Sequence, residues 1–138
     1  MTPVLLDTGV IVSLLDRSEA SHSACSDVIS NLDAPLVTCE AVISESCYLL
    51  RRLQGASEAI LDNVIAGIFQ IPFQLSREST EVKQILRRYR DQKIDFADAC
   101  LINMANTFGT ADVLTLDRDF TIYRWGKNKP FRLLLNPK

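Results

Sequence analysis

Four acidic residues stand where an α/β protein could place the ligands of a metal ion. The first is Asp7, which follows the continuous apolar run Val4-Leu5-Leu6. A short apolar run without alternation predicts a strand that is buried on both faces, as in a parallel sheet. Because ligands bind at the carboxyl ends of such strands, we expect Asp7 to lie at the functional edge of the sheet. The other three acids are Glu45, Asp98 and Asp117.

Asp117 follows a second segment of the same kind. The run Asp112-Val113-Leu114-Thr115-Leu116 leads to Asp117 much as Val4-Leu5-Leu6 leads to Asp7. Strands and helices alternate along the chain, and this alternation predicts a parallel sheet with right-handed crossovers. Both acid-ending strands would then point the same way, so we expect Asp7 and Asp117 to meet at one edge.

Glu45 and Asp98 lie on predicted helices. Glu45 is framed by apolar residues in the helix predicted over 40–54, where an unpaired carboxylate is costly to bury. If buried, it would need a cation, a basic partner or a raised pKa. It could instead lie at the edge of the helix or pair with Arg51 or Arg52, and the local sequence does not decide between these roles. Asp98 comes three residues after Asp95, a predicted N-cap, and an acid in the first helical turn is also favourable without any chemistry. The role of Asp98 is therefore open on local grounds.

Carboxylates gathered at one sheet edge repel one another unless a positive charge lies between them. This set offers oxygen ligands only, because His22 is the single histidine and the four cysteines show no Cys-x-x-Cys spacing. Oxygen ligands select a hard divalent cation, Mg²⁺ or Mn²⁺. Such a cation commonly acts on phosphate esters, where it activates water and neutralises charge on the phosphate oxygens.

The elements that must position these acids form one domain over residues 1–138. Helices are predicted over 10–15, 20–32, 40–54, 57–70, from Ser76 to about Tyr89 and over 95–108, and strands over 4–6, 36–38, 71–73, 112–116 and 131–135. This order predicts a three-layer α/β/α sandwich with a mostly parallel sheet of four or five strands. No apolar run could cross a membrane, and no secretion signal is visible, so we expect reduced cysteines and a cytoplasmic location.

The net charge of the chain does not identify its binding partner. The net charge is −2 and the sequence pI is about 5.3, so composition alone does not indicate a nucleic-acid-binding protein. Basic residues nevertheless gather within 83–90 and 118–132, as solvated helix faces or as a surface that follows a phosphate backbone. The candidates for contact with such a backbone are Arg87, Arg88, Arg90 and Arg118.

Taken in order, these motifs resemble the PIN domain, and closely the VapC-type toxins of bacterial toxin–antitoxin pairs. The resemblance spans nearly the whole chain and is carried by Leu6-Asp7-Thr8-Gly9, Glu45, Asp95-Phe96-Ala97-Asp98-Ala99 and Thr115-Leu116-Asp117-Arg118-Asp119-Phe120. It implies a metal-dependent endoribonuclease that cleaves RNA, with Asp7, Glu45, Asp98 and Asp117 as metal ligands, Thr8 and Thr115 as supporting hydroxyls and Asp119 as a variable fifth acid. It also implies a homodimer and a separate antitoxin protein whose C-terminal segment blocks the site.

Other classes of protein remain as alternatives. A haloacid-dehalogenase-like phosphatase needs a second acid two residues after the first, where this chain has Gly9, and a dinucleotide-binding domain needs a Gly-x-Gly-x-x-Gly turn. A phosphoacceptor domain would use one acid as a nucleophile, and a structure-specific DNA nuclease could use the same acids. A housekeeping RNA-processing nuclease and a non-catalytic RNA-binding or assembly module are the alternatives within the resembled family. Loss of the acids would favour the non-catalytic module, yet all four are present.

Overall fold

A parallel sheet runs through the centre of the molecule. The computed structural model describes residues 2–136, so residues 1, 137 and 138 of the predicted domain lie outside it. Its five main strands pair in the order β3-β2-β1-β4-β7, and every neighbouring pair is parallel. The strands are β1 (Val4–Leu6), β2 (Leu36–Val37), β3 (Phe69–Gln70), β4 (Asp112–Leu114) and β7 (Arg132–Leu133). The predicted mostly parallel sheet is confirmed.

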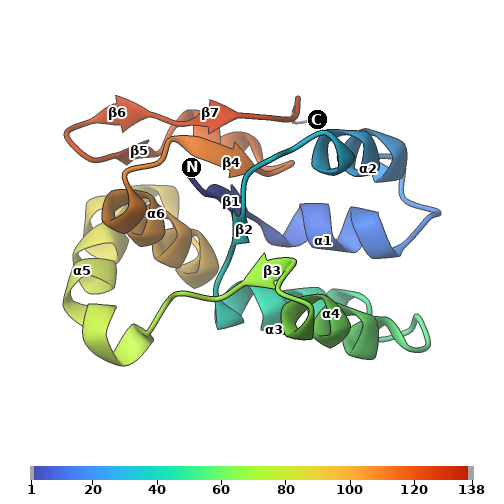
Figure 1. Cartoon of the computed structure of the whole chain (residues 1–138). Coiled ribbons are helices and arrows are strands. Elements are labelled where there is room, and N and C mark those ends of the chain that lie inside the picture. The colour runs from blue at the N-terminus through green and yellow to red at the C-terminus, as the bar shows by residue number, and fades with distance from the viewer. Residues whose placement is uncertain (1, 137–138) are drawn as a thin grey trace.

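Helices flank this sheet, with α1 and α2 on one side and α5 and α6 on the other (Figure 1). The helices are α1 (Thr8–Leu15), α2 (His22–Ser30), α3 (Glu40–Leu49), α4 (Ala56–Ile65), α5 (Leu75–Arg88) and α6 (Phe96–Phe108), with the 3₁₀ turns η1 (Arg90–Gln92) and η2 (Arg118–Thr121). The predicted three-layer arrangement is therefore confirmed. Within residues 2–136, no helix is both long and apolar enough to span a membrane.

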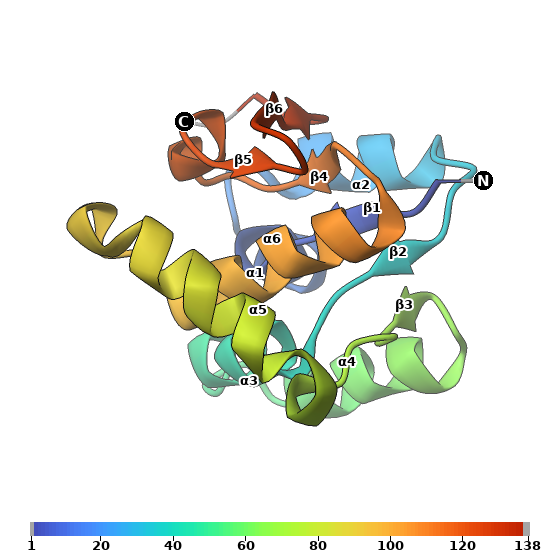
Figure 2. The ribbon, with the colours of Figure 1, turned by 90° about the vertical axis from the view of Figure 1, so that its left-hand side faces the viewer.

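The most buried helix is α6, which lies between α5 and the central strand β1 (Figure 2). All residues from 97 to 105 are buried, because the sheet covers one face of α6 and α5 covers another. A helix buried in this way has little room for charge. Asp98 is its buried carboxylate, and the structure places that carboxylate at the end of the helix nearest to the ends of β1 and β4.

The structure corrects the bounds predicted between residues 50 and 73. Helix α3 ends at Leu49 rather than at residue 54, and α4 ends at Ile65 rather than near residue 70. Gly55, with a φ of 80°, is the N-cap residue of α4, so this helix begins at Ala56 rather than at residue 57. The strand predicted over 71–73 is instead β3, which ends at Gln70, because Pro72 has no N–H to donate to a neighbouring strand.

A hairpin between Tyr123 and the last strand was not predicted. Strands β5 (Arg124–Trp125) and β6 (Lys129–Pro130) pair antiparallel in a small second sheet. The connection turns through Gly126 and Asn128, which have positive φ values of 56° and 62°. Two-residue strands contain too little alternation to be recognised by their hydrophobic pattern.

Candidate metal centre

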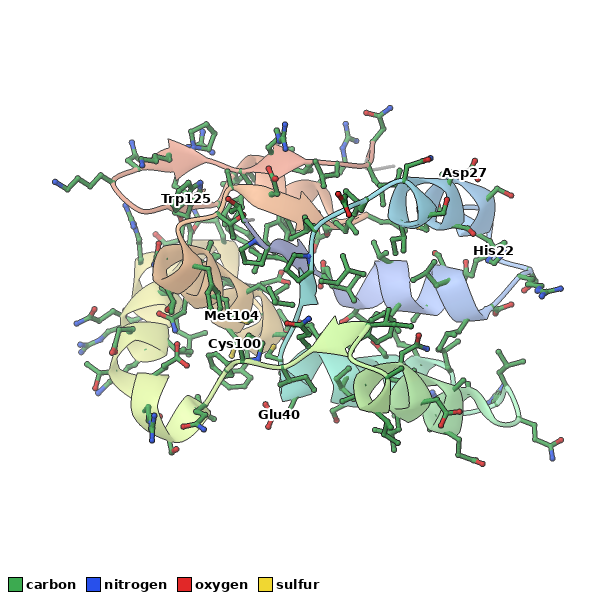
Figure 3. The ribbon with its side chains drawn as sticks, viewed as in Figure 1. His22, Asp27, Glu40, Cys100, Met104 and Trp125 are labelled. Atoms are coloured by element: carbon green, nitrogen blue, oxygen red, sulfur yellow. The ribbon has the colours of Figure 1, made fainter. Side chains whose placement is uncertain are left out.

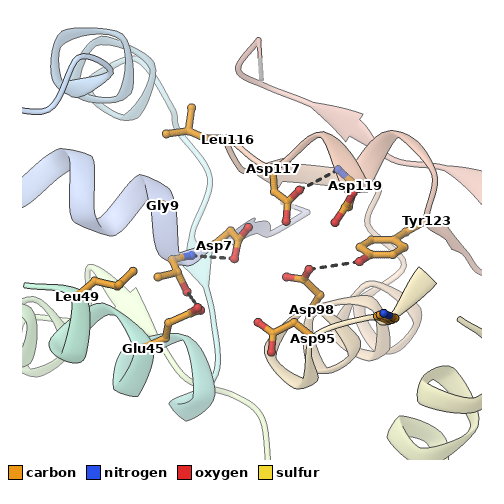
Figure 4. Close-up of a pocket in the computed structure, with 12 residues that line it drawn as sticks. Asp7, Gly9, Glu45, Leu49, Asp95, Asp98, Leu116, Asp117, Asp119 and Tyr123 are labelled. Carbon is orange, nitrogen blue, oxygen red and sulfur yellow. Dashed lines mark hydrogen bonds between the residues drawn. The ribbon is translucent and has the colours of Figure 1, made fainter. Parts of the chain in front are cut away.

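Three of the four predicted acids meet at the carboxyl edge of the sheet. One carboxylate oxygen from each of Asp7, Asp98 and Asp117 lies within 4.8 Å of the others. Asp7 follows β1 and Asp117 lies just beyond β4, and these two parallel strands end side by side, with Leu6 opposite Leu114. Asp98 reaches the same point from the first turn of α6. The three carboxylates face one another in a pocket of about 360 Å³ (Figure 4).

Two hydrogen bonds hold the carboxylate of Asp7. The Thr115 hydroxyl donates to Oδ2 over 2.7 Å, and the backbone N–H of Thr8 donates to Oδ1 over 2.8 Å. Burial nevertheless raises the pKa of Asp7 to about 6, because desolvation disfavours the charged form more than these hydrogen bonds stabilise it. Both oxygens of Asp7 therefore have defined directions, and its negative charge lacks a compensating positive charge.

Asp98 is the most perturbed acid of the pocket. Burial, followed by repulsion from the neighbouring carboxylates, raises the pKa of Asp98 to about 8. The Tyr123 hydroxyl, 3.4 Å from Oδ2, donates a long hydrogen bond to it (Figure 4). Burial and the nearby Asp98 also raise the pKa of Tyr123, so the phenol stays a neutral donor. Near neutral pH, without a cation, the proton-bound form of Asp98 is favoured.

Glu45 lines the same pocket but lies outside the group of three carboxylates. Its Oε1 accepts a 2.7 Å hydrogen bond from the Thr8 hydroxyl. Thr8 thus connects two acids, with its N–H on Asp7 and its hydroxyl on Glu45. Arg51, a basic partner considered for Glu45 from sequence, lies over the ring of Tyr48 instead, 4.0 Å from its centroid.

The segment after β4 is organised by Thr115. Its hydroxyl accepts a hydrogen bond from the backbone N–H of Asp117 over 3.0 Å while donating to Asp7. Oδ1 of Asp117 in turn accepts from the backbone N–H of Asp119 over 2.9 Å, and Asp119 also lines the pocket. The hydroxyls of Thr8 and Thr115 therefore each orient one acid of the pocket.

Sequence reasoning missed three polar residues that line the pocket: Lys93, Asp95 and Tyr123. Asp95 occupies the N-cap position of α6 as predicted, but its side chain accepts no capping hydrogen bond there. Because the capping pattern already explained Asp95, nothing in the sequence placed it beside the acids of the pocket. Lys93 and Tyr123 carry no local signal, because only the fold brings them to this edge.

The basic residues chosen from sequence do not line this pocket. Arg87, Arg88, Arg90 and Arg118 are all exposed, and Arg88 lines a separate crevice between α5 and α6. Within residues 2–136, one salt bridge is present, between Arg132 and Asp112 at 2.7 Å. No acid of the pocket therefore forms a salt bridge within these residues. Unpaired carboxylates that offer oxygen ligands fit a hard divalent cation.

Comparison with known proteins agrees with this geometry. The sequence profile described as PIN domain matches residues 4–126, which include all four predicted acids. The chain belongs to the PIN domain family. This PIN domain is 30% identical to Ribonuclease VapC26 of Mycobacterium tuberculosis over 117 residues, which cover 83% of this chain and 87% of that protein. It also shares its fold with Mycobacterium tuberculosis VapC20, whose crystal structure is described as that of a sarcin-ricin loop cleaving toxin. The TM-score is 0.80 at 19% identity, over 92% of this chain and 99% of that one.

Proposed function

We propose that this PIN domain is an endoribonuclease that depends on Mg²⁺ or Mn²⁺ and serves as the toxin of a toxin–antitoxin pair. The observation that carries the proposal is the meeting of Asp7, Asp98 and Asp117 within 4.8 Å without a basic partner among residues 2–136. Similarity to Ribonuclease VapC26 supports RNA as the substrate, and the shared fold with a VapC toxin supports the biological role.

Asp7, Asp98 and Asp117 would hold the cation. Glu45, which accepts a hydrogen bond from the Thr8 hydroxyl, would contribute a further carboxylate. A cation bound there would supply activation of water and neutralisation of the negative charge on the phosphate oxygens. Thr115 and Thr8 keep the Asp7 oxygens in fixed directions, which reduces the reorganisation needed on binding. The raised pKa values of Asp7 and Asp98 fit this role, because a nearby positive charge would favour the ionised form of both.

The experiment that tests this proposal measures cleavage of a labelled single-stranded RNA. The purified protein should cleave with Mg²⁺ or Mn²⁺ and stop in excess EDTA, and Asp98→Asn and Asp117→Asn should be inactive. Asp27→Asn is the matched control, because Asp27 is exposed on α2, across the molecule from α6 (Figure 3). Cleavage that persists in EDTA, or in both pocket variants, would contradict the proposal.

The proposed role as a toxin has its own test. A short neighbouring gene would encode the antitoxin, and its product would bind this chain and suppress cleavage. Expression of the chain alone in a bacterial host should arrest growth, and co-expression of the neighbour should restore it. Cleavage in vitro without growth arrest would favour a housekeeping RNA-processing nuclease, and absence of both would favour a non-catalytic module.

We also propose a single domain that acts in the cytoplasm as a homodimer. Exposed apolar side chains on α3, α4 and the turn after α4 support dimerisation, since surface patches of this kind commonly mark interfaces. They are Tyr48, Leu49, Leu61, Ile65 and Ile68, of which Ile65 is 83% exposed. Light scattering should give twice the mass of the chain, and a monomer at micromolar concentration would count against the dimer.

A further inference from the structure

Lys93 is the basic residue among those that line the acidic pocket, and its side chain is exposed. The other charged residues of the lining are acids, namely Asp7, Glu45, Asp95, Asp98, Asp117 and Asp119. An RNA strand is itself negatively charged, so these acids oppose its approach wherever a bound cation does not compensate them. A cationic side chain in the lining can attract one phosphate of the RNA and so partly offset this repulsion.

The backbone of Lys93 is unusual for a lysine. Its φ is 53° and its ψ is 48°, in the left-handed region, at the residue that ends η1. Side chains with a Cβ are disfavoured there, and helix ends of this kind normally use glycine or asparagine. The other non-glycine residue with positive φ in residues 2–136 is Asn128, an amino acid that tolerates this conformation. Strained residues are concentrated at functional sites, so a lysine in this conformation needs an explanation.

The ammonium group of Lys93 is free to bind a ligand. The salt bridge present within residues 2–136 joins Arg132 and Asp112, and Lys93 takes part in none. Two other basic side chains near the C-terminus, by contrast, make contacts within the protein. Lys129 lies over the ring of Trp125, 4.8 Å from its centroid, and the Arg124 guanidinium donates to backbone carbonyls of residues 121–123.

We propose that Lys93 binds the RNA phosphate adjacent to the scissile phosphate and so sets the position of the strand in the pocket. This inference depends on the proposed ribonuclease function and deepens it. Lys93 lies two residues before Asp95 and five before Asp98, so a short connection limits its distance from the acids at the start of α6. Substrate binding would then explain why a lysine occupies this left-handed position, even though asparagine or glycine would suit the backbone conformation better.

The test uses two substitutions at Lys93. Lys93→Asn removes the charge while suiting the left-handed backbone, so it should melt no lower than the parent. It should raise KM for a short single-stranded RNA about tenfold, the size expected for losing one charge-assisted hydrogen bond, with a smaller change in kcat. The log–log dependence of binding on salt should fall by about 0.7, as for one lost phosphate contact on a single strand. Lys93→Arg keeps the charge and should retain most of the binding.

The matched control is Arg17→Asn, which removes one exposed positive charge just beyond α1, at the opposite end of that helix from Asp7. It should leave KM and the salt dependence unchanged. RNA binding is also followed by fluorescence anisotropy, so that Lys93 is tested even if the parent does not cleave. Equal binding by Lys93→Asn and the parent would overturn the role of Lys93 alone. A parent that binds RNA but never cleaves it would overturn the nuclease proposal, and a parent that binds no RNA would overturn both.

Discussion

The Thr115 hydroxyl donates a 2.7 Å hydrogen bond to Oδ2 of Asp7 and so joins two residues that are 108 positions apart in the sequence. The same hydroxyl accepts from the backbone N–H of Asp117. One buried hydroxyl thus links the carboxylate of Asp7 to the backbone of Asp117, which lies beyond the end of the neighbouring strand. This contact is possible because β1 and β4 are parallel neighbours whose last residues are in register.

Thr115→Val should therefore weaken both the fold and the site. Valine has nearly the same shape but leaves Oδ2 of Asp7 and the N–H of Asp117 without this partner, which costs about 1–3 kcal/mol of unfolding free energy. It should also lower the affinity for Mn²⁺, because the Asp7 carboxylate loses its fixed direction. Urea unfolding and titration with Mn²⁺ measure the two effects.

Thr110→Val is the matched control for this substitution. The buried Thr110 hydroxyl donates to the backbone carbonyl of Pro3 over 2.7 Å and accepts from the N–H of Asp112 over 3.2 Å, outside the lining of the acidic pocket. It should destabilise the protein by a similar amount and leave the affinity for Mn²⁺ unchanged. Equal loss of affinity in both variants would show that Thr115 acts on stability alone.

Asp98→Asn should melt at a higher temperature than the parent in excess EDTA. The buried Asp98 must fold either ionised among other acids or with a bound proton, and the amide removes both penalties. Adding Mn²⁺ should stabilise the parent by up to about 2.7 kcal/mol at a hundredfold excess over the dissociation constant, and should do little for the variant. If Asp98 only interacted with the helix dipole, the variant would melt lower by about 0.3–1 kcal/mol with or without metal.

The stability of the metal-free protein should fall as the pH rises from about 4 to 8. The folded-state pKa values of Asp7 and Asp98, about 6 and about 8, both exceed the ordinary value of 3.8. At these two sites the folded protein binds more protons than the unfolded chain in this window, so the contribution of Asp7 and Asp98 to stability is fully present below about pH 4 and is lost as the pH rises through about 6 and about 8. Urea midpoints in EDTA should show this decline, and Asp98→Asn should flatten its upper part. A parent profile as flat as that of Asp98→Asn would contradict the raised pKa of Asp98.

Charge-neutralising substitutions of Arg87, Arg88 and Arg90 to Gln should weaken RNA binding and change kcat little. These residues are exposed at the end of α5 and in η1 and do not line the acidic pocket, so they can contact RNA only outside it. Each lost phosphate contact should reduce the salt dependence of binding by about 0.7 on a log–log scale. An unchanged slope would show that this surface faces away from the substrate.

Local patterns in the sequence determined the parts of this protein that depend on near neighbours. The apolar runs before Asp7 and Asp117 predicted two strands of a parallel sheet, because a strand covered on both faces can carry charge only at its end. The helix predicted to end at residue 108 does end there, because Gly109 follows it with a φ of 61°, a conformation that suits glycine. The acids at these element ends were therefore recognisable before their distances were known.

Only the tertiary structure decided which of these residues share a site. A local pattern reports burial and turns but not the distance between elements. It therefore did not reveal that Glu45 lies outside the group of three carboxylates, or that Asp95 lines the pocket as well as occupying the N-cap position of α6. The raised pKa of Asp98 is likewise a property of the fold, since it comes from burial in α6 and from acids on two other strand ends. Lys93 entered the site for the same reason: the fold, rather than any motif, places the residue that follows η1 beside the pocket.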